Sequence, residues 1–188
     1  MNFENDILQC LKVLNNGGTI LYPTDTIWGI GCDATNADAV EKIIALKQRP
    51  AQKSFVVLVA DEREIIKYVA SPDLAVFDYL DKTQKPTTVI YEHALGLAEN
   101  VLADNGSVAI RICMDEFCKH LIKRFRKPIV STSANISGES APAFFKEISK
   151  MIIKGADYVV QYRQDDVSKA APSSIIKWVN GKVVTIRK

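Results

Sequence analysis

The residues best suited to chemistry in this chain include a group of cations close together in the sequence. Lys47, Arg49 and Lys53 lie within seven positions of one another, beside the predicted end of a helix. Cations at the C-terminal end of a helix can simply interact with its dipole, so a purely structural interpretation is available. The functional alternative is a local anion site, since fixed cations bind phosphate and carboxylate groups.

Arg111 differs from these cations because it lies inside an apolar segment, residues 107–113 (SVAIRIC). A buried guanidinium without an anionic partner is energetically unfavourable. The partner could be a carboxylate of the protein or a carboxylate brought by a ligand. We favour the ligand, in which case the empty site would carry uncompensated positive charge.

Two polar segments follow predicted strands and could supply hydroxyl groups to such a site. Residues 131–142 (STSANISGESAP) hold more hydrogen-bonding groups than a turn requires, although an exposed loop can have the same composition. Residues 22–34 (YPTDTIWGIGCDA) lead from a strand into two threonines and two glycines. Open α/β sheets bind ligands beyond the carboxyl ends of their strands. The alternative is a plain connection in which Gly29 and Gly31 provide turns.

Other reactive side chains give weaker signals. His93 and His120 stand in polar surroundings, which is typical of surface residues. None of the four cysteines forms a Cys-x-x-Cys pair, so we expect free thiols in or near the core. Cys118 and His120 have no second pair nearby, and we expect no metal site.

The elements that must position these residues alternate along the chain. We expect helices at residues 7–14, 36 to near 50, 61–69, 73–82, 115–125 and 143–153, and strands at 19–22, 55–60, 87–91, 107–113, 128–132, 157–162, 173–179 and 182–187. The apolar run 55–60 predicts a strand covered on both faces. Asn180-Gly181 predicts a hairpin between the last two strands. The result is a mixed α/β sheet in one domain, residues 1–188.

Composition limits the possible classes of protein. The chain has 188 residues, of which 47% are hydrophobic and 24% charged, as in ordinary globular proteins. No apolar stretch approaches the roughly 20 residues that span a bilayer, and the N-terminus lacks a signal-peptide pattern, so we expect a cytoplasmic protein. A net charge of +2 is lower than that of most nucleic-acid-binding domains.

Five motifs in order resemble the YrdC/TsaC family of threonylcarbamoyl-AMP synthases. They are PTDT (23–26), K-x-R (47–49), A-I-R (109–111), STSAN-x-SG (131–138) and PSS (172–174), followed by Arg187. The resemblance runs from about residue 5 to the C-terminus. It implies a single α/β domain whose twisted sheet and flanking helices surround a deep, positively lined cavity.

The resemblance also implies a reaction. L-threonine, bicarbonate and ATP would give threonylcarbamoyl-AMP and pyrophosphate, and the product would pass to the machinery that makes the t6A modification of tRNA. Mg²⁺ is expected to accompany ATP. Carboxylated threonine attacks the α-phosphorus of ATP, so positioning and electrostatic stabilisation can account for catalysis without a protein nucleophile.

The resemblance assigns site residues in three groups. The catalytic tetrad would be Lys47, Arg49, Ser133 and Asn135. ATP would be bound by Arg49, Lys53, Ser107, Ser133, Ala141 and Arg187. Threonine would be bound by Thr26, Arg111, Ser131 and Ser173.

Some positions depart from the family pattern and leave alternatives open. KPTTVI (85–90) replaces the usual Pro-Gly-Pro-x-Thr, while Trp28, Ser54 and Cys113 replace a usual Tyr, Pro and Pro. YciO-like relatives, which lack parts of the tetrad, suggest a nucleotide-hydrolase-like alternative. A module that binds double-stranded RNA, or tRNA weakly, is a second alternative.

Overall fold

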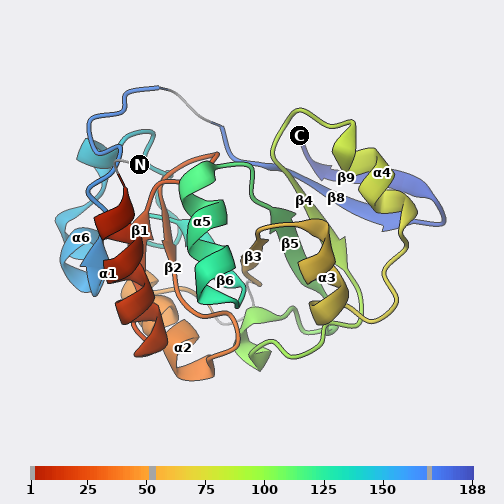
Figure 1. Cartoon of the computed structure of the whole chain (residues 1–188), viewed down its shortest axis with the longest axis horizontal. Helices are drawn as coiled ribbons and strands as arrows, with labels where there is room; N and C mark the ends of the chain where they lie inside the picture. The colour runs from red at the N-terminus through yellow and green to blue at the C-terminus, as the bar shows by residue number, and fades with distance from the viewer. Residues whose placement is uncertain (1–2, 51–53, 169–170) are drawn as a thin grey trace.

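A twisted mixed β-sheet with flanking helices organises the chain (Figure 1). The computed structural model describes residues 3–50, 54–168 and 171–188. In these residues the helices are α1 (Glu4–Asn15), α2 (Ala37–Lys47), α3 (Glu62–Tyr68), α4 (Ala75–Asp81), α5 (Glu116–Phe125) and α6 (Lys150–Gly155), with short 3₁₀ turns η1 (Glu99–Val101) and η2 (Phe145–Glu147). The strands are β1 (Ile20–Tyr22), β2 (Gly29–Gly31), β3 (Val56–Val59), β4 (Thr87–Tyr91), β5 (Val108–Ile112), β6 (Ile129–Ser133), β7 (Tyr158–Val159), β8 (Ser174–Val179) and β9 (Lys182–Arg187).

The strand order in the described residues is β7-β1-β2-β6-β3-β5-β4-β8-β9. Three neighbouring pairs are parallel, namely β1 with β7, β3 with β5 and β4 with β8, and the other pairs are antiparallel. The predicted mixed α/β sheet is therefore confirmed. The β8–β9 hairpin forms one end of the sheet, beside α4 in the view of Figure 1.

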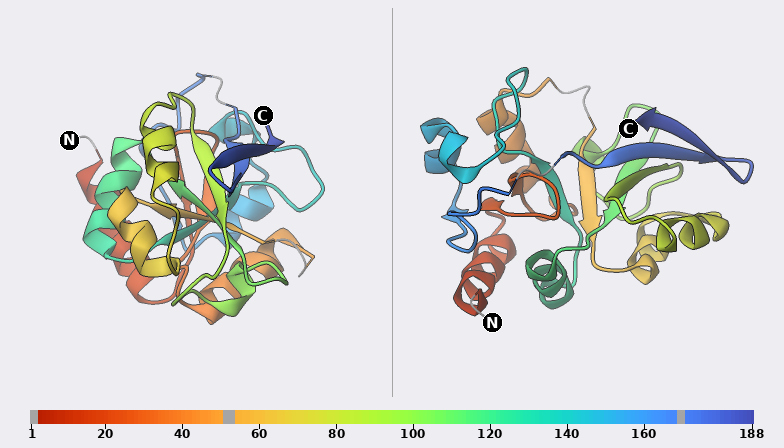
Figure 2. Two further views of the ribbon diagram at one scale, coloured as in Figure 1. Left: turned by 90° about the vertical axis from the view of Figure 1, so that its right-hand side faces the viewer. Right: turned by 90° about the horizontal axis from the view of Figure 1, so that it is seen from above.

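Side chains alternate between the two faces of the sheet, and different helices cover those faces. Ile20 and Tyr22 of β1 pack in the cluster that includes α1 and α5, whereas Leu21 packs in a cluster with Ile152 of α6. Figure 2 shows α1 and α5 side by side, with α6 on the opposite side of the sheet. Strand β1 is thus buried on both faces.

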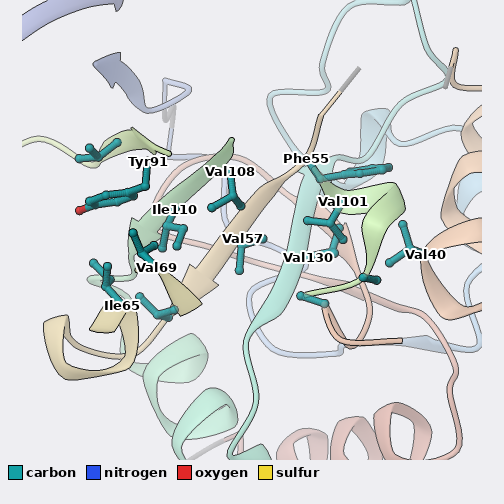
Figure 3. Close-up of a cluster of buried hydrophobic side chains, with 14 of the residues drawn as sticks. Val40, Phe55, Val57, Ile65, Val69, Tyr91, Val101, Val108, Ile110 and Val130 are labelled. Carbon is teal, nitrogen blue, oxygen red and sulfur yellow. The ribbon is translucent and has the colours of Figure 1, made fainter. Parts of the chain in front are cut away.

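The central strands β3, β5 and β6 carry the largest core cluster (Figure 3). Val57 and Val59 of β3 lie in this cluster, while Leu58 between them lies in the cluster below α1 and α5. The apolar run at residues 55–60 is therefore covered on both faces, as predicted from its lack of alternation.

Local signals in the sequence place several element ends correctly. The Asn36 side chain accepts a hydrogen bond from the Ala39 amide at 3.1 Å and caps α2. Asn180 and Gly181 both have positive φ, 50° and 71°, as a tight hairpin turn between β8 and β9 requires. The predicted hairpin is confirmed.

Strand β2 was not predicted, because Gly29 and Gly31 suggested turns. Both glycines instead lie in the strand, paired with β1 and, at Gly29, with β6. A Cβ atom on Gly31 would lie only 2.2 Å from the Val130 carbonyl oxygen. Glycine is needed here for close approach of two strands, which a single sequence does not reveal.

Two other predicted elements are shorter than expected. The helix predicted at 143–153 is reduced to η2 and α6, because Ile148 is extended and the Ser149 side chain caps a new helix start. The strand predicted at 157–162 ends after Val159. The amides of Gln161 and Tyr162 donate to the Asp6 carboxylate, at 3.0 and 2.9 Å, instead of to a strand.

The cysteines are Cys10, Cys32, Cys113 and Cys118, and all four are buried free thiols, as predicted. Burial raises the pKa of Cys10 and Cys32 above the usual range, which favours the neutral thiol. None of the helices in the described part of the chain is both long and apolar enough to cross a membrane.

Candidate active site

A cavity of about 350 Å³ lies where the β1–β2 loop, β5, β6 and the start of β8 meet. Its lining includes many residues that the sequence predicted for a ligand site. They are Thr26, Arg49, Arg111, Ser131, Ser133, Ala141, Ser173 and Arg187. These residues come from distant parts of the chain, so the sheet brings together what the sequence separates.

The cavity is lined by cations and hydroxyl groups. Arg49, Arg111 and Arg187 contribute guanidinium groups, and none of the described lining residues is an aspartate or glutamate. Low-dielectric walls with charge of one sign concentrate the electrostatic field. The cavity is therefore suited to an anionic ligand, although the whole chain carries a net charge of only +2.

Arg111 has a protein partner, which corrects the expectation that its empty site carries uncompensated charge. Nη2 of Arg111 lies 3.1 Å from Oδ1 of Asp25, and the two side chains are 5% and 7% exposed. The aspartate of the PTDT motif thus offsets the cost of burying the guanidinium. The pairing does not exclude a ligand, because Arg111 also lines the cavity.

Arg49 lies just after α2 and reaches the wall of the cavity. Its Nη2 donates to the Ser54 carbonyl oxygen at 2.7 Å, and its guanidinium carbon lies 4.4 Å from the centre of the Phe55 ring. Burial lowers the pKa of Arg49, but a guanidinium stays charged at any physiological pH. Stacking on Phe55 restricts the orientation of this cation.

Lys47 does not line the cavity, in contrast to the expectation that it meets the ligand. Its side chain is 1% exposed, and Nζ donates to the main-chain oxygens of Ser133 and, at 2.5 Å, Asn135. The Lys47 carbonyl in turn accepts from the Ser137 amide at 2.8 Å. Burial, with a smaller contribution from Arg49, lowers the pKa of Lys47 to about 8. In this structure Lys47 fixes the segment that follows β6.

The Asn135 side chain also bonds to the main chain of the segment after β6. Its side-chain amide donates to the carbonyl oxygens of Ile136 and Glu139, at 2.9 and 2.8 Å, and it does not line the cavity. The predicted tetrad is therefore divided. Arg49 and Ser133 face the cavity, whereas Lys47 and Asn135 bond to the main chain at the end of β6 and in the segment after it.

Thr26 is fixed by the other threonine of its motif. The Thr24 hydroxyl lies 2.9 Å from the Thr26 hydroxyl and accepts from the Thr26 amide at 3.0 Å. Thr24 also donates to the Ile27 carbonyl oxygen at 2.9 Å. This local network explains why the motif contains two threonines, of which only Thr26 lines the cavity.

Ser173 connects β4 to the last strand. Its hydroxyl lies 2.8 Å from the Thr88 hydroxyl, and both residues are buried. Its carbonyl oxygen accepts from Nε and Nη2 of Arg187, at 3.2 and 2.8 Å. Arg187 is thereby held at the cavity although β9 is largely exposed. The sequence did not identify Thr88, whose neighbour Ser173 is 85 positions away.

A second cavity, of about 470 Å³, adjoins the first and contains Ser107. The two share Ser54, Val56 and Ile175. Most of its other lining side chains are apolar, namely Phe55, Ile90, Ala103, Ala109 and Ile186. Ser107 donates to the Asn105 side chain at 2.7 Å, and the predicted nucleotide residues Ser107 and Arg49 thus lie in different but contiguous cavities.

Lys53 lies outside the described residues. His93 is exposed and His120 is 35% exposed, which agrees with surface positions. In the part of the chain that the structure describes, no group of three or more His, Cys, Asp or Glu side chains could hold a metal ion. Asp25 was missed as a site-forming residue, although it lies within a motif and Arg111 was expected to need an anionic partner.

Comparison with known proteins gives consistent matches over almost the whole chain. The family model Sua5/YciO/YrdC, described as telomere recombination, matches residues 12–188. A threonylcarbamoyl-AMP synthase of Pseudoalteromonas translucida is 29% identical over 97% of this chain and 98% of its own length. A putative threonylcarbamoyl-AMP synthase of Methanocaldococcus jannaschii is 35% identical over 97% of this chain and 85% of its own length.

Solved structures share the fold at low sequence identity. Sua5 of P. abyssi, crystallised with L-threonine, has a TM-score of 0.86 and 20% identity; the match covers 98% of this chain but 54% of Sua5. The chain thus spans about half the length of that protein. YciO of E. coli has a TM-score of 0.83 and 22% identity over 98% of this chain and 89% of YciO.

Proposed function

Because the chain belongs to the Sua5/YciO/YrdC family, we propose that it is a threonylcarbamoyl-AMP synthase acting on L-threonine, bicarbonate and ATP. The observation that carries the proposal is the cavity itself. Three guanidinium groups and several hydroxyls line it, without a carboxylate among the described lining residues. Such a lining favours joining an anionic amino-acid derivative to a polyphosphate.

The reaction requires two bonds to form. The amine of threonine first takes up bicarbonate to give a carbamate, with loss of water. An oxygen of this carbamate then attacks the α-phosphorus of ATP, and the bond to the β-phosphate breaks to release pyrophosphate. Negative charge accumulates around the α-phosphorus during this step, and positioned cations lower its energy.

We assign the roles from the position of each residue around the cavity. Arg49, Arg187 and the Ser133 hydroxyl would contact phosphate oxygens, while Arg111 would bind the threonine carboxylate as a bidentate pair. Thr26, Ser131 and Ser173 would complete the amino-acid site. Lys47 and Asn135 would act by holding the end of β6, where Ser133 lies, and the segment after it. No side chain needs to form a covalent intermediate.

The nucleoside would extend into the adjoining cavity of about 470 Å³. Its mainly apolar lining suits a nucleobase, and Asp104, Asn105 and Ser107 are polar groups at this end. Ala141, with its small side chain, lines the first cavity and would leave room beside the phosphates of ATP. We propose that Mg²⁺ enters with ATP, because phosphate oxygens can supply its ligands where the described lining of the first cavity has no carboxylate.

The product would be consumed by the transferase machinery that forms t6A on tRNA, in the cytoplasm. Direct contact of this chain with tRNA is not needed for that role, since the adenylate can be transferred as a small molecule. The double-stranded RNA alternative predicts RNA binding that persists at high salt, and the YciO-like alternative predicts nucleotide hydrolysis independent of threonine.

The test is incubation of the purified protein with ATP, Mg²⁺, bicarbonate and L-threonine. We expect pyrophosphate release that depends on threonine, together with threonylcarbamoyl-AMP detected by mass spectrometry. Two control reactions are run in parallel, one with L-serine in place of L-threonine and one without bicarbonate. Pyrophosphate or phosphate release that is independent of threonine, without the adenylate, would support the YciO-like hydrolase instead.

A further inference from the structure

Asp25 is a buried acid of the β1–β2 loop whose two carboxylate oxygens have different partners. Oδ1 lies 3.1 Å from Nη2 of Arg111. Oδ2 accepts a hydrogen bond from the Met114 amide at 3.0 Å. The carboxylate is thus fixed to the main chain just after β5 while it faces a side chain that projects from β5.

The pair leaves hydrogen-bonding capacity unused. Among the described residues, neither Nε of Arg111 nor Oδ1 of Asp25 has a hydrogen-bond partner of good geometry. A buried ion pair stabilises a fold only when its remaining donors and acceptors are satisfied. This arrangement is therefore poorly suited to a purely structural role. It suits a guanidinium that is held ready for another anion.

The two residues also differ in their relation to the cavity. Arg111 lines it, whereas Asp25 does not. We infer that Asp25 is a positioning residue, which sets the plane of the Arg111 guanidinium so that its free N–H groups meet the carboxylate of the amino-acid substrate. The inference rests on the proposed function, which identifies L-threonine as the ligand of Arg111.

Removing the charge of Asp25 has two opposed effects on a bound carboxylate. It removes repulsion between two anions, which would tighten binding, and it frees the guanidinium to rotate, which would weaken binding. A bidentate contact between a guanidinium and a carboxylate requires two N–H groups of the guanidinium to lie in the plane of the carboxylate. Because Asp25 holds Arg111 through a main-chain anchor, we expect the loss of orientation to dominate.

The experiment is a double-mutant cycle on the full chain with Asp25→Asn, Arg111→Met and the double variant. Calorimetric titration gives the affinities for L-threonine and for ATP, and thermal unfolding gives the stability of each protein. Asp33→Asn is the matched control. The Asp33 side chain is likewise buried, 3% exposed against 7% for Asp25, and its Oδ2 accepts from Lys127 at 2.6 Å, but Asp33 does not line either cavity.

We expect Asp25→Asn to weaken threonine binding by about tenfold and to leave ATP binding unchanged. In the Arg111→Met background the same substitution should not weaken threonine binding, since the orienting effect of Asp25 requires Arg111 and the loss of anion repulsion alone can only tighten binding. The double variant should unfold at a higher temperature than either single variant, because neither charge is left buried alone. Asp33→Asn should lower stability without changing threonine affinity.

The outcomes separate this inference from the proposed function. Wild-type protein that fails to bind threonine would overturn the proposed substrate and the role of Asp25 with it. Wild-type protein that binds threonine, combined with unchanged or tighter binding by Asp25→Asn, would overturn the positioning role alone. The positioning role would also be overturned if Asp25→Asn weakened threonine binding equally in wild-type protein and in the Arg111→Met background.

Discussion

At the scale of single residues, the structure distinguishes cations that face the cavity from one that supports its wall. Arg49 reaches the cavity and stacks on Phe55. Lys47, two positions earlier, is fully buried and bonded to main-chain oxygens of the segment after β6. Substitution of Arg49 should therefore affect mainly activity, whereas substitution of Lys47 should affect mainly stability.

Replacing Arg49 with alanine should abolish most synthase activity while the protein still folds. Loss of a fixed cation beside the reacting phosphate costs about 3 kcal/mol of transition-state stabilisation, or about a hundredfold in rate. Pyrophosphate release measures the rate, and circular dichroism establishes that the variant is folded. Arg63→Ala, at an exposed position of α3, is the control. Near-normal turnover in folded Arg49→Ala would refute the role of Arg49.

Lys47 should make stability depend on pH in a defined direction. Its folded-state pKa is lowered to about 8 from 10.5, mainly by burial, so the folded protein binds this proton less tightly than the unfolded chain. Between these two pKa values the unfolded state binds more protons, and stability rises with pH. The unfolding free energy of wild type, minus that of Lys47→Met, should therefore increase from pH 8 to 10. A constant difference would show that the ammonium is not destabilised by folding.

At the scale of elements, the β1–β2 hairpin brings the PTDT loop to the cavity only because β2 can lie close to β6. Gly29 pairs with Ser133, and a Cβ atom at Gly29 would lie 3.2 Å from the Ser131 hydroxyl oxygen. At Gly31 the contact would be much closer, with the Val130 carbonyl oxygen. Both glycines thus allow β2 to lie close to β6, but Gly29 faces a β6 side chain and Gly31 faces the β6 backbone.

Gly31→Ala should destabilise the protein more than Gly29→Ala. The added methyl group at Gly31 meets rigid backbone and forces the strands apart, which we expect to cost about 3 kcal/mol. At Gly29 the neighbour is a side chain that can rotate, and the main effect should be on activity because Ser131 lines the cavity. Thermal unfolding and pyrophosphate release of both variants test this order. Equal stability of the two variants would contradict it.

At the scale of the whole molecule, a chain with a small net charge has a cavity whose described lining contains arginines and no carboxylate. The chain carries +2 overall, while the first cavity has three arginines. A nucleic-acid-binding surface needs many phosphate contacts and shows a steep dependence on salt. A cavity of this size instead suits a ligand that enters it.

RNA binding should therefore be weak at physiological salt. We expect the affinity for a double-stranded RNA to fall steeply between about 50 and 200 mM salt, as for contacts made mainly to phosphates. ATP affinity should be retained over this range, because dissolved salt ions screen charges inside a cavity less than charges on an open surface. Fluorescence titration with labelled RNA and with an ATP analogue provides both values. Tight RNA binding that persists at high salt, without ATP binding, would favour an RNA-binding module.

The sequence alone determined the elements that depend on local chemistry. The Asn36 cap, the Asn180-Gly181 turn and the uninterrupted apolar run of β3 act within a few residues, so their physical causes are visible in the chain. The motifs also identified the candidate site residues and the family. The roles of these residues remain predictions.

Only the tertiary structure decided which predicted residues face the cavity and which support it. Lys47 and Asn135 turn to main-chain oxygens, and Asp25 meets Arg111 from 86 positions away, because the sheet order places β1, β2 and β6 beside β3 and β5. The strand at Gly29–Gly31 likewise depends on the neighbouring β6 backbone. Long-range pairing is set by the packing of the whole sheet, and no local pattern in the sequence encodes it.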